Sequence, residues 1–173
     1  SLSPSIVAQR VHDGLMAIGG ASDGAYSDVF VTAFYGVLDR RTGVLTYIRA
    51  AQDRPLLLRK DEKPYPLPGD GRFLGMLDDL ELQEYQVKLE SGDALLMMSD
   101  GIPDAQNSAG EAFGNERLVA LLQGATLGGA DEVVETVLDG MHNWMGNTPL
   151  FDDLTLVAVS LDDKLPMIGE QSQ

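Results

Sequence analysis

The sequence of 173 residues contains no cysteine and only two histidines. Disulfide bonds, thiolate zinc sites and a cysteine nucleophile are therefore excluded. The absence of cysteine fits a reducing compartment, so we expect a cytoplasmic protein. No apolar run reaches the roughly 18 residues that a membrane-spanning helix needs. No signal peptide opens the sequence either, and we expect no association with a membrane.

Basic residues are also scarce, since 12 Lys and Arg stand against 27 Asp and Glu, which gives a formal net charge of −15. Nucleic acids and anionic membrane surfaces bind basic surfaces, so neither is expected as a partner. A negative potential raises the local concentration of divalent cations and also keeps a protein soluble. The charge is therefore compatible with a metal site but does not demonstrate one.

The pattern of segments predicts a single α+β domain, because runs of short strands alternate with helices at fixed places. Strands are expected at residues 29–38, 44–50, 55–59, 82–89, 94–98 and 154–159, and helices are expected to begin near residues 3, 115 and 131. The strand at 29–38 is apolar on both faces and is expected in the middle of a layered structure. The turn at 90–93 predicts that the strands on either side of it pair with each other. Residues 162–173 have little to bury and are expected to form a tail.

The first helix is predicted by a Ser-Pro pair at residues 3 and 4, which suits a helix start. Its buried face is predicted from the apolar residues that recur at helical spacing, Val7, Val11, Leu15 and Ile18. His12 lies off this stripe, so we expect a solvated side chain there rather than a metal ligand.

The candidate functional residues lie where a buried strand is expected to end. Residues 94–98 are apolar throughout and are followed directly by Ser99, Asp100 and Gly101. Asp100 is thus held at the end of a rigid element, and Gly101 lets the chain turn sharply and leaves open space beside the carboxylate. The acidic pair at 152–153 precedes another apolar strand. We predict that these two strand ends meet and share hard metal ions.

A plain turn is the alternative interpretation of Asp100, because Asp-Gly between apolar segments is also the commonest hairpin signal. Ile102 and Pro103 speak against a hairpin, since proline cannot continue a central ladder. The pair Asp152 and Asp153 is, taken alone, also typical of an ordinary loop before a strand.

Five segments resemble motifs of the bacterial SpoIIE-like branch of the PPM (type 2C) metal-dependent Ser/Thr protein phosphatases. They are the early strand, the hairpin after it, the Thr/Ser-Asp-Gly-Ile/Val turn with its Glu-Ala-x-Asn, the Phe-Gly-x-x-Arg-Leu motif and the closing Asp-Asp-Ile/Leu/Met-Thr motif. In this sequence they lie at residues 30–39, 42–47, 99–107, 113–118 and 151–155. The resemblance runs from residue 3 to residue 161, and the order and spacing of the motifs make it specific.

The resemblance implies an αββα sandwich of two stacked antiparallel sheets, with the phosphatase domain at residues 1–161. It also implies two Mn²⁺ or Mg²⁺ ions, hard cations that take oxygen ligands. Asp100 and Asp152 would be the catalytic metal ligands, with Gly101 leaving room for an ion and its waters and Asp153 beside them. Asn107 and Arg117 would order the loop and helix that follow.

The reaction that the resemblance implies is hydrolysis of phosphoserine or phosphothreonine on a partner protein. In this branch the substrate is usually a phosphorylated anti-sigma-factor antagonist. The domain is often preceded by a sensor or by a receiver domain of the two-component response-regulator kind. These expectations come from the resemblance alone.

The sequence departs from the family pattern in two places. The acidic Gly-Asp-x-x-Asp and Asp-x-x-Gly-x-Gly motifs, which supply the bridging carboxylate, are absent and would lie before Ser1. Gln52 stands where the family has the histidine of Ala-Gly-His-Asn/Pro-Pro. Glutamine carries no proton at neutral pH, so either an acid–base role is lost or the position only bonds the adjoining loop. We expect an N-terminally truncated domain that is nearly inactive alone, and keep a catalytically impaired adaptor as the alternative.

Overall fold

The computed structural model describes residues 3–21, 29–125 and 128–161, and the predicted tail at 162–173 lies outside them. The chain divides into two compact units, the first formed by residues 1–54 and 68–88 and the second by residues 55–67 and 89–173. Each unit contains one antiparallel sheet with helical cover. None of the helices within the described ranges is long and apolar enough to cross a membrane.

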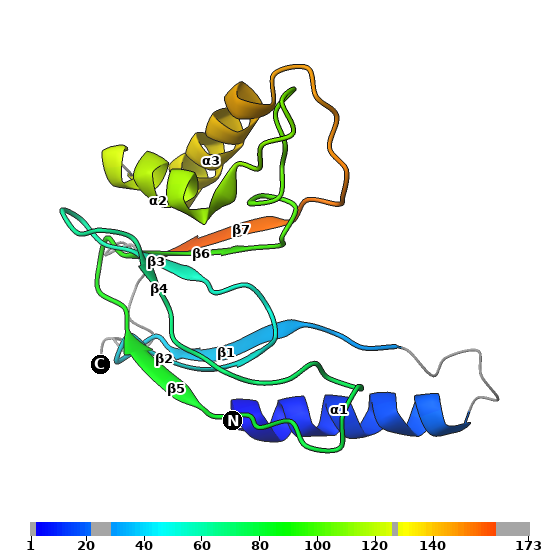
Figure 1. Cartoon of the computed structure of the whole chain (residues 1–173). Helices are drawn as coiled ribbons and strands as arrows, with labels where there is room; N and C mark the ends of the chain where they lie inside the picture. The colour runs from blue at the N-terminus through cyan, green and yellow to red at the C-terminus, as the bar shows by residue number, and fades with distance from the viewer. Residues whose placement is uncertain (1–2, 22–28, 126–127, 162–173) are drawn as a thin grey trace, which may run out of the picture. The chain divides into compact units, whose positions relative to one another are not determined.

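The first unit consists of a three-stranded sheet and one helix. The strand order is β1 (Ala33–Asp39), β2 (Val44–Ala50) and β5 (Tyr85–Lys88), and α1 (Pro4–Ala21) packs on β1 and β2 (Figure 1). The core between helix and sheet is formed by Ala8, Ile48, Ala50, Leu74 and Leu80. Small residues at two of these positions allow the helix to approach the sheet closely.

The second unit contains a four-stranded sheet in the order β4 (Tyr65–Pro66), β3 (Leu56–Leu58), β6 (Ala94–Met98) and β7 (Leu156–Ser160). The helices α2 (Gly114–Gly124) and α3 (Ala130–Met145) cover one face of this sheet (Figure 1). The inner face of α3 carries Val133, Val137, Met141 and Met145, all buried, at a spacing of four residues. This apolar stripe forms the core face of the helix.

One prediction about strand pairing is wrong. β5 pairs with β2, whereas β6 pairs with β3 and β7, so the turn at 90–93 carries the chain from one sheet to the other. Alternating apolar residues show that a strand has a buried face but do not show which strand lies beside it. β1 is also less covered than its apolar residues on both faces predicted, because all of its residues are half-buried or exposed.

The buried face of α1 is centred on other residues than those predicted, although Leu15 of the predicted stripe does pack against this core. Ala8 and His12 are each 3% exposed, whereas Val11 and Ile18 are 46% and 56% exposed. The His12 side chain is not solvated, because its Nδ1 accepts the backbone N–H of Gly75 at 3.0 Å. That partner lies 63 residues away in the sequence, so local periodicity could not reveal it.

Candidate functional site

The ends of β6 and β7 bring the two acidic turns together. The strands are antiparallel with Met98 opposite Leu156, so the residues after β6 lie beside those before β7. Ser99 extends this pairing, because its N–H donates to the Thr155 carbonyl at 3.0 Å and its Oγ accepts the Thr155 N–H at 3.0 Å. The prediction that the two strand ends meet is confirmed for their backbones. In Figure 1 the segment between α3 and β7 runs beside the loop that follows β6.

Gly101 is the point of closest approach between the two turns. A Cβ atom at this position would lie 2.6 Å from the carbonyl oxygen of Asp153 and 3.4 Å from the Cα of Leu154. The first distance is shorter than any real contact of a side-chain carbon. The space beside Gly101 is therefore filled by the backbone of the other turn, rather than open as we expected. Glycine is required here because it lets the two acidic segments touch.

The three acidic residues, Asp100, Asp152 and Asp153, are exposed while the backbone beneath them is fixed. The Asp152 carboxylate accepts the N–H of Asp153 at 2.7 Å. The Asp100 carbonyl accepts the N–H of Asp104 at 2.9 Å, and Ile102, inside this turn, is fully buried. The turns therefore present carboxylates to solvent from an ordered base.

The donor chemistry at this end of the sheet fits Mn²⁺ or Mg²⁺, because both prefer carboxylate oxygens. Residues 3–21, 29–125 and 128–161 nevertheless contain no group of three or more His, Cys, Asp or Glu side chains that could hold a metal ion. The two turns therefore provide part of a ligand set. The predicted roles of Asp100, Gly101, Asp152 and Asp153 in metal binding stay predictions.

The segment after the Asp100 turn forms a closed loop, here called the 103–114 loop. Two backbone hydrogen bonds join its arms, from the Phe113 N–H to the Ala105 carbonyl at 2.7 Å and from the Gly114 N–H to the Pro103 carbonyl at 2.8 Å. Asn107 closes the tip, because its Oδ1 accepts two backbone N–H groups of the loop at 2.9 and 3.0 Å. The expectation that Asn107 orders this loop is confirmed.

Arg117 and Trp144 hold the returning arm of the same loop. One guanidinium nitrogen of Arg117 donates to the carbonyls of Ala112 and Phe113 at 3.1 and 3.2 Å, and its Cζ lies 4.0 Å from the Trp144 ring centroid. The Trp144 Nε1–H donates to the Glu111 carbonyl at 3.0 Å. Arg117 orders the loop as expected. The contact of Trp144 was not predicted, because it joins residues 33 positions apart in the sequence.

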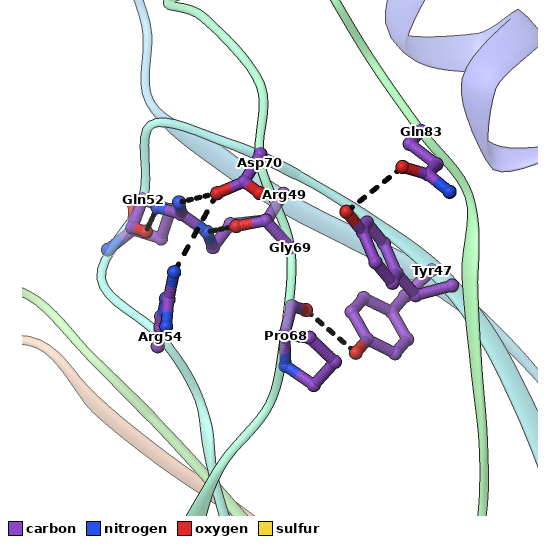
Figure 2. A network of polar contacts seen from close by, with 9 residues as sticks. Tyr47, Arg49, Gln52, Arg54, Pro68, Gly69, Asp70 and Gln83 are labelled. Carbon is purple, nitrogen blue, oxygen red and sulfur yellow. Dashed lines mark hydrogen bonds and ion pairs between the residues drawn. The ribbon is translucent and has the colours of Figure 1, made fainter.

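The position of the family's histidine lies in the first unit, just after β2. The Gln52 side chain accepts a hydrogen bond from Thr32 Oγ1 at 2.8 Å, and its carbonyl accepts one from Arg49. Figure 2 shows that Arg49 also donates to the Gly69 carbonyl and approaches Asp70, at 2.6 and 3.7 Å. Gln52 thus belongs to a network that ties this segment to a neighbouring loop. This geometry supports the interpretation in which position 52 bonds the adjoining loop.

A partly buried ion pair lies at the opposite end of β6 from Asp100. Asp93 is 5% exposed, and its carboxylate accepts hydrogen bonds from Arg59 Nε at 3.1 Å and from the Glu90 N–H at 2.9 Å. The hydrogen bond that Arg59 donates to Asp93 raises the pKa of the Arg59 guanidinium above its ordinary value. This pair fixes the turn that precedes β6 and is separate from the acidic turns.

Comparison with known proteins gives one matching family model and several relatives. The model of stage II sporulation protein E (SpoIIE) matches residues 1–162. Protein IcfG of Synechocystis sp. is 28% identical over 131 residues, which are 76% of this chain and 20% of that protein. Phosphoserine phosphatase RsbU of Bacillus subtilis is 25% identical over 134 residues, which are 77% of this chain and 39% of that protein. The chain therefore spans less than half the length of either relative.

Solved structures agree with this assignment at the level of the fold. The SiaA-PP2C domain of Pseudomonas aeruginosa has a TM-score of 0.69 at 20% identity, and the match covers 91% of this chain and 68% of that chain. Within the described residues the chain has two antiparallel sheets and three helices, which is the α+β fold of PP2C phosphatase domains. The predicted fold class is confirmed.

Proposed function

Because this chain belongs to the SpoIIE family, we propose that it contributes part of the active site of a metal-dependent protein serine/threonine phosphatase. The observation that carries the proposal is the meeting of the Asp100 and Asp152 turns at one end of the β6–β7 pair. The name of the relative RsbU, phosphoserine phosphatase, supports the class of reaction.

Hydrolysis of a phosphoserine breaks the bond between phosphorus and the serine oxygen and consumes one water. Two Mn²⁺ or Mg²⁺ ions, when bound, would neutralise the phosphoryl oxygens and lower the pKa of the attacking water. Asp100 would hold its place because it follows the rigid strand β6 after one residue, Ser99, which is itself bonded to Thr155. Asp152 would be oriented by the hydrogen bond that its carboxylate accepts from the Asp153 N–H. Gln52 would exchange no proton at neutral pH, so no acid–base step is assigned to it.

The two proposed metal ions need more ligands than these two carboxylates. Since the described residues contain no cluster of three ligands, Asp100 and Asp152 by themselves would bind one ion weakly. We propose that carboxylates of the kind found in the family's Gly-Asp-x-x-Asp motif complete the centre in the full-length gene product. This chain alone should then have little or no activity.

The proposed substrate is a phosphorylated anti-sigma-factor antagonist, and the proposed regulator is a sensor or receiver domain. Both follow from the family resemblance. Residues at the acidic turns would act on the phosphoryl group common to all such substrates, so the test of the chemistry does not depend on the partner.

The test measures Mn²⁺-dependent phosphate release from a phosphoserine peptide by the full-length gene product. Asp100→Asn and Asp152→Asn should each reduce kcat/KM by about a hundredfold or more, because each removes a ligand charge while keeping the shape. Asp104→Asn is the matched control, since Asp104 is an exposed carboxylate in the same turn whose only described bond to Asp100 uses its backbone N–H. Full activity in both ligand variants would refute the assignment.

A second candidate is a phosphatase-fold adaptor that binds a regulatory partner without chemistry. The replacement of histidine by Gln52, bonded to Thr32, favours it. Calorimetric titration of the full-length gene product with Mn²⁺ separates the two candidates. The phosphatase should bind Mn²⁺ and lose that binding in Asp100→Asn, whereas the adaptor should show no tight binding at all.

A further inference from the structure

We propose that Arg117 and Trp144 are positioning residues that hold the Asp100 turn in the geometry needed for metal binding, an inference that rests on the proposed phosphatase function. Arg117 comes from α2 and Trp144 from α3. Neither belongs to the acidic turns, and they act on those turns through the 103–114 loop. We call the two side chains the Arg–Trp clamp.

The Arg–Trp clamp donates hydrogen bonds to three consecutive carbonyls of the returning arm. The Trp144 indole N–H donates to the carbonyl of residue 111, and one Arg117 nitrogen donates to those of residues 112 and 113, at 3.0 to 3.2 Å. The guanidinium stacks on the indole at 4.0 Å, so each side chain also fixes the other. Tryptophan is the best ring for a cation–π pair, and arginine is the cation found there more often. The arm is thus tied to both helices at once.

The returning arm is in turn tied to the arm that begins at Asp100. The hydrogen bonds from Phe113 to Ala105 and from Gly114 to Pro103 join the two arms, and the Asp104 N–H bonds the Asp100 carbonyl. An unbroken series of hydrogen bonds therefore runs from the Arg–Trp clamp to the turn that carries the candidate ligand. A shift of the returning arm would be passed to that turn.

Apart from the hydrogen bonds that Asn107 makes within the loop, other contacts do little to order its tip. Phe113 anchors the base of the loop because it is 4% exposed, but residues 106–112 are half-buried or fully exposed. A loop segment with little buried apolar surface opens locally at low free-energy cost unless polar contacts hold it. The Arg–Trp clamp supplies such contacts. Residues that orient the groups around a metal ligand affect metal affinity even though they do not touch the ion.

The variants to test are Arg117→Ala, Arg117→Lys and Trp144→Phe. Lysine keeps a cation near the ring but loses the planar donor, and phenylalanine keeps an aromatic face but loses the indole N–H. The matched control is Arg59→Ala, which breaks the pair with Asp93 at the opposite end of β6 and leaves the 103–114 loop untouched. A general loss of stability in the second unit should appear in the control as well.

The first measurement is the Mn²⁺ concentration for half-maximal phosphatase activity of the full-length gene product. Arg117→Ala should raise this concentration about tenfold, and Arg117→Lys and Trp144→Phe should raise it by less. A loss of metal affinity of this size is expected when a group that orients a ligand is removed. Arg59→Ala should leave it unchanged. An unchanged value in Arg117→Ala, or an equal rise in Arg59→Ala, would overturn the positioning role.

The second measurement is amide hydrogen exchange in this chain without metal. In Arg117→Ala the amides of Asn107, Glu111 and Phe113, which are hydrogen-bonded within the loop, should exchange faster, while those of β6 keep their rate. If the full-length wild type shows no Mn²⁺-dependent activity, the proposed function fails. Hydrogen exchange is then the measurement that tests whether the Arg–Trp clamp orders the loop. Unaltered exchange at these three amides would then overturn it, and faster exchange would support the ordering of the loop.

Discussion

Ala51 has a left-handed backbone conformation, with a φ of 54°, directly after β2. The motif that this segment resembles has glycine here, and glycine adopts such a φ without steric penalty. Ala51→Gly should raise the free energy of unfolding by up to about 1 kcal/mol, because the relieved strain of about 1–2 kcal/mol exceeds the entropic cost of about 0.5–1 kcal/mol. Urea unfolding measures the change.

The control for this substitution is Ala50→Gly, one residue earlier. Ala50 is fully buried in the extended strand β2, so glycine there loses packing and gains no relief. Ala50→Gly should therefore lower the free energy of unfolding, whereas Ala51→Gly should raise it. Equal losses in both variants would contradict the explanation from backbone strain.

Gly101→Ala should break the contact between the two acidic turns. The new methyl group would meet the Asp153 carbonyl at 2.6 Å, so the turns must separate at a cost of about 1–3 kcal/mol. Urea unfolding should show the loss. Gly14→Ala provides the contrast, because nothing lies within 4 Å of a Cβ at that position of α1 and alanine favours helices by up to about 1 kcal/mol. A Gly101→Ala variant as stable as the wild type would show that the backbones of the two turns are not in close contact.

The candidate site could be predicted from the sequence where local chemistry changes abruptly. Asp100 and Asp152 stood out because each lies beside an apolar strand and within a motif that resembles the family pattern, although either turn alone is also typical of an ordinary loop. The contact of Trp144 with the Glu111 carbonyl could not be predicted, because it joins residues 33 positions apart and the tryptophan also fits the helical stripe of α3.

At the scale of helices and strands, the segments with the clearest apolar pattern were predicted best. β6 is apolar throughout and lies between two strands under two helices, and α3 has a single apolar stripe. The buried face of α1 was centred on the wrong residues because the decisive partners of Ala8 and His12 are the sheet and Gly75, which no helical periodicity encodes. The sequence therefore indicates that elements exist more reliably than it indicates which elements touch.

The N-terminus of α1 is capped by Glu84, a residue just before β5. Its Oε1 accepts hydrogen bonds from the Ser3 hydroxyl and, at 2.8 Å, from the Ser5 N–H. The bond from Ser3, followed by that from Ser5, lowers the pKa of Glu84 below its ordinary value. A lowered pKa in the folded state means that the contact stabilises the fold above the ordinary pKa. This contribution is lost as the pH falls through the lowered value.

Wild-type stability should therefore fall more steeply than that of Glu84→Gln when the pH drops below about 4.5, the ordinary pKa of the group. Urea unfolding between pH 6 and pH 3 measures both slopes. Ser3→Ala removes the largest cause of the shift and should reproduce part of the difference. Parallel slopes in wild type and Glu84→Gln would show that the carboxylate contributes nothing to the cap.

At the scale of the whole molecule, the net charge of −15 acts on stability through screening. Like charges repel one another in the compact state, and added salt reduces this repulsion. Any salt should therefore stabilise the chain, including salts of Mn²⁺ and Mg²⁺. A rise in Tm on adding a divalent ion is by itself no sign of a binding site.

Ion-specific binding becomes visible only when Mn²⁺ and Na⁺ are compared at equal ionic strength. The described residues contain no cluster of three ligands, so 1 mM Mn²⁺ should stabilise this chain by less than about 1 kcal/mol beyond screening, as expected for a dissociation constant near or above that concentration. In the full-length gene product the excess should be larger, and it should vanish in the Asp100→Asn, Asp152→Asn double variant. Tight, Asp100-dependent stabilisation of this chain alone would show that the acidic turns complete a metal centre without further ligands. No excess in the full-length gene product would favour the adaptor, because a phosphatase that uses Mn²⁺ must bind it.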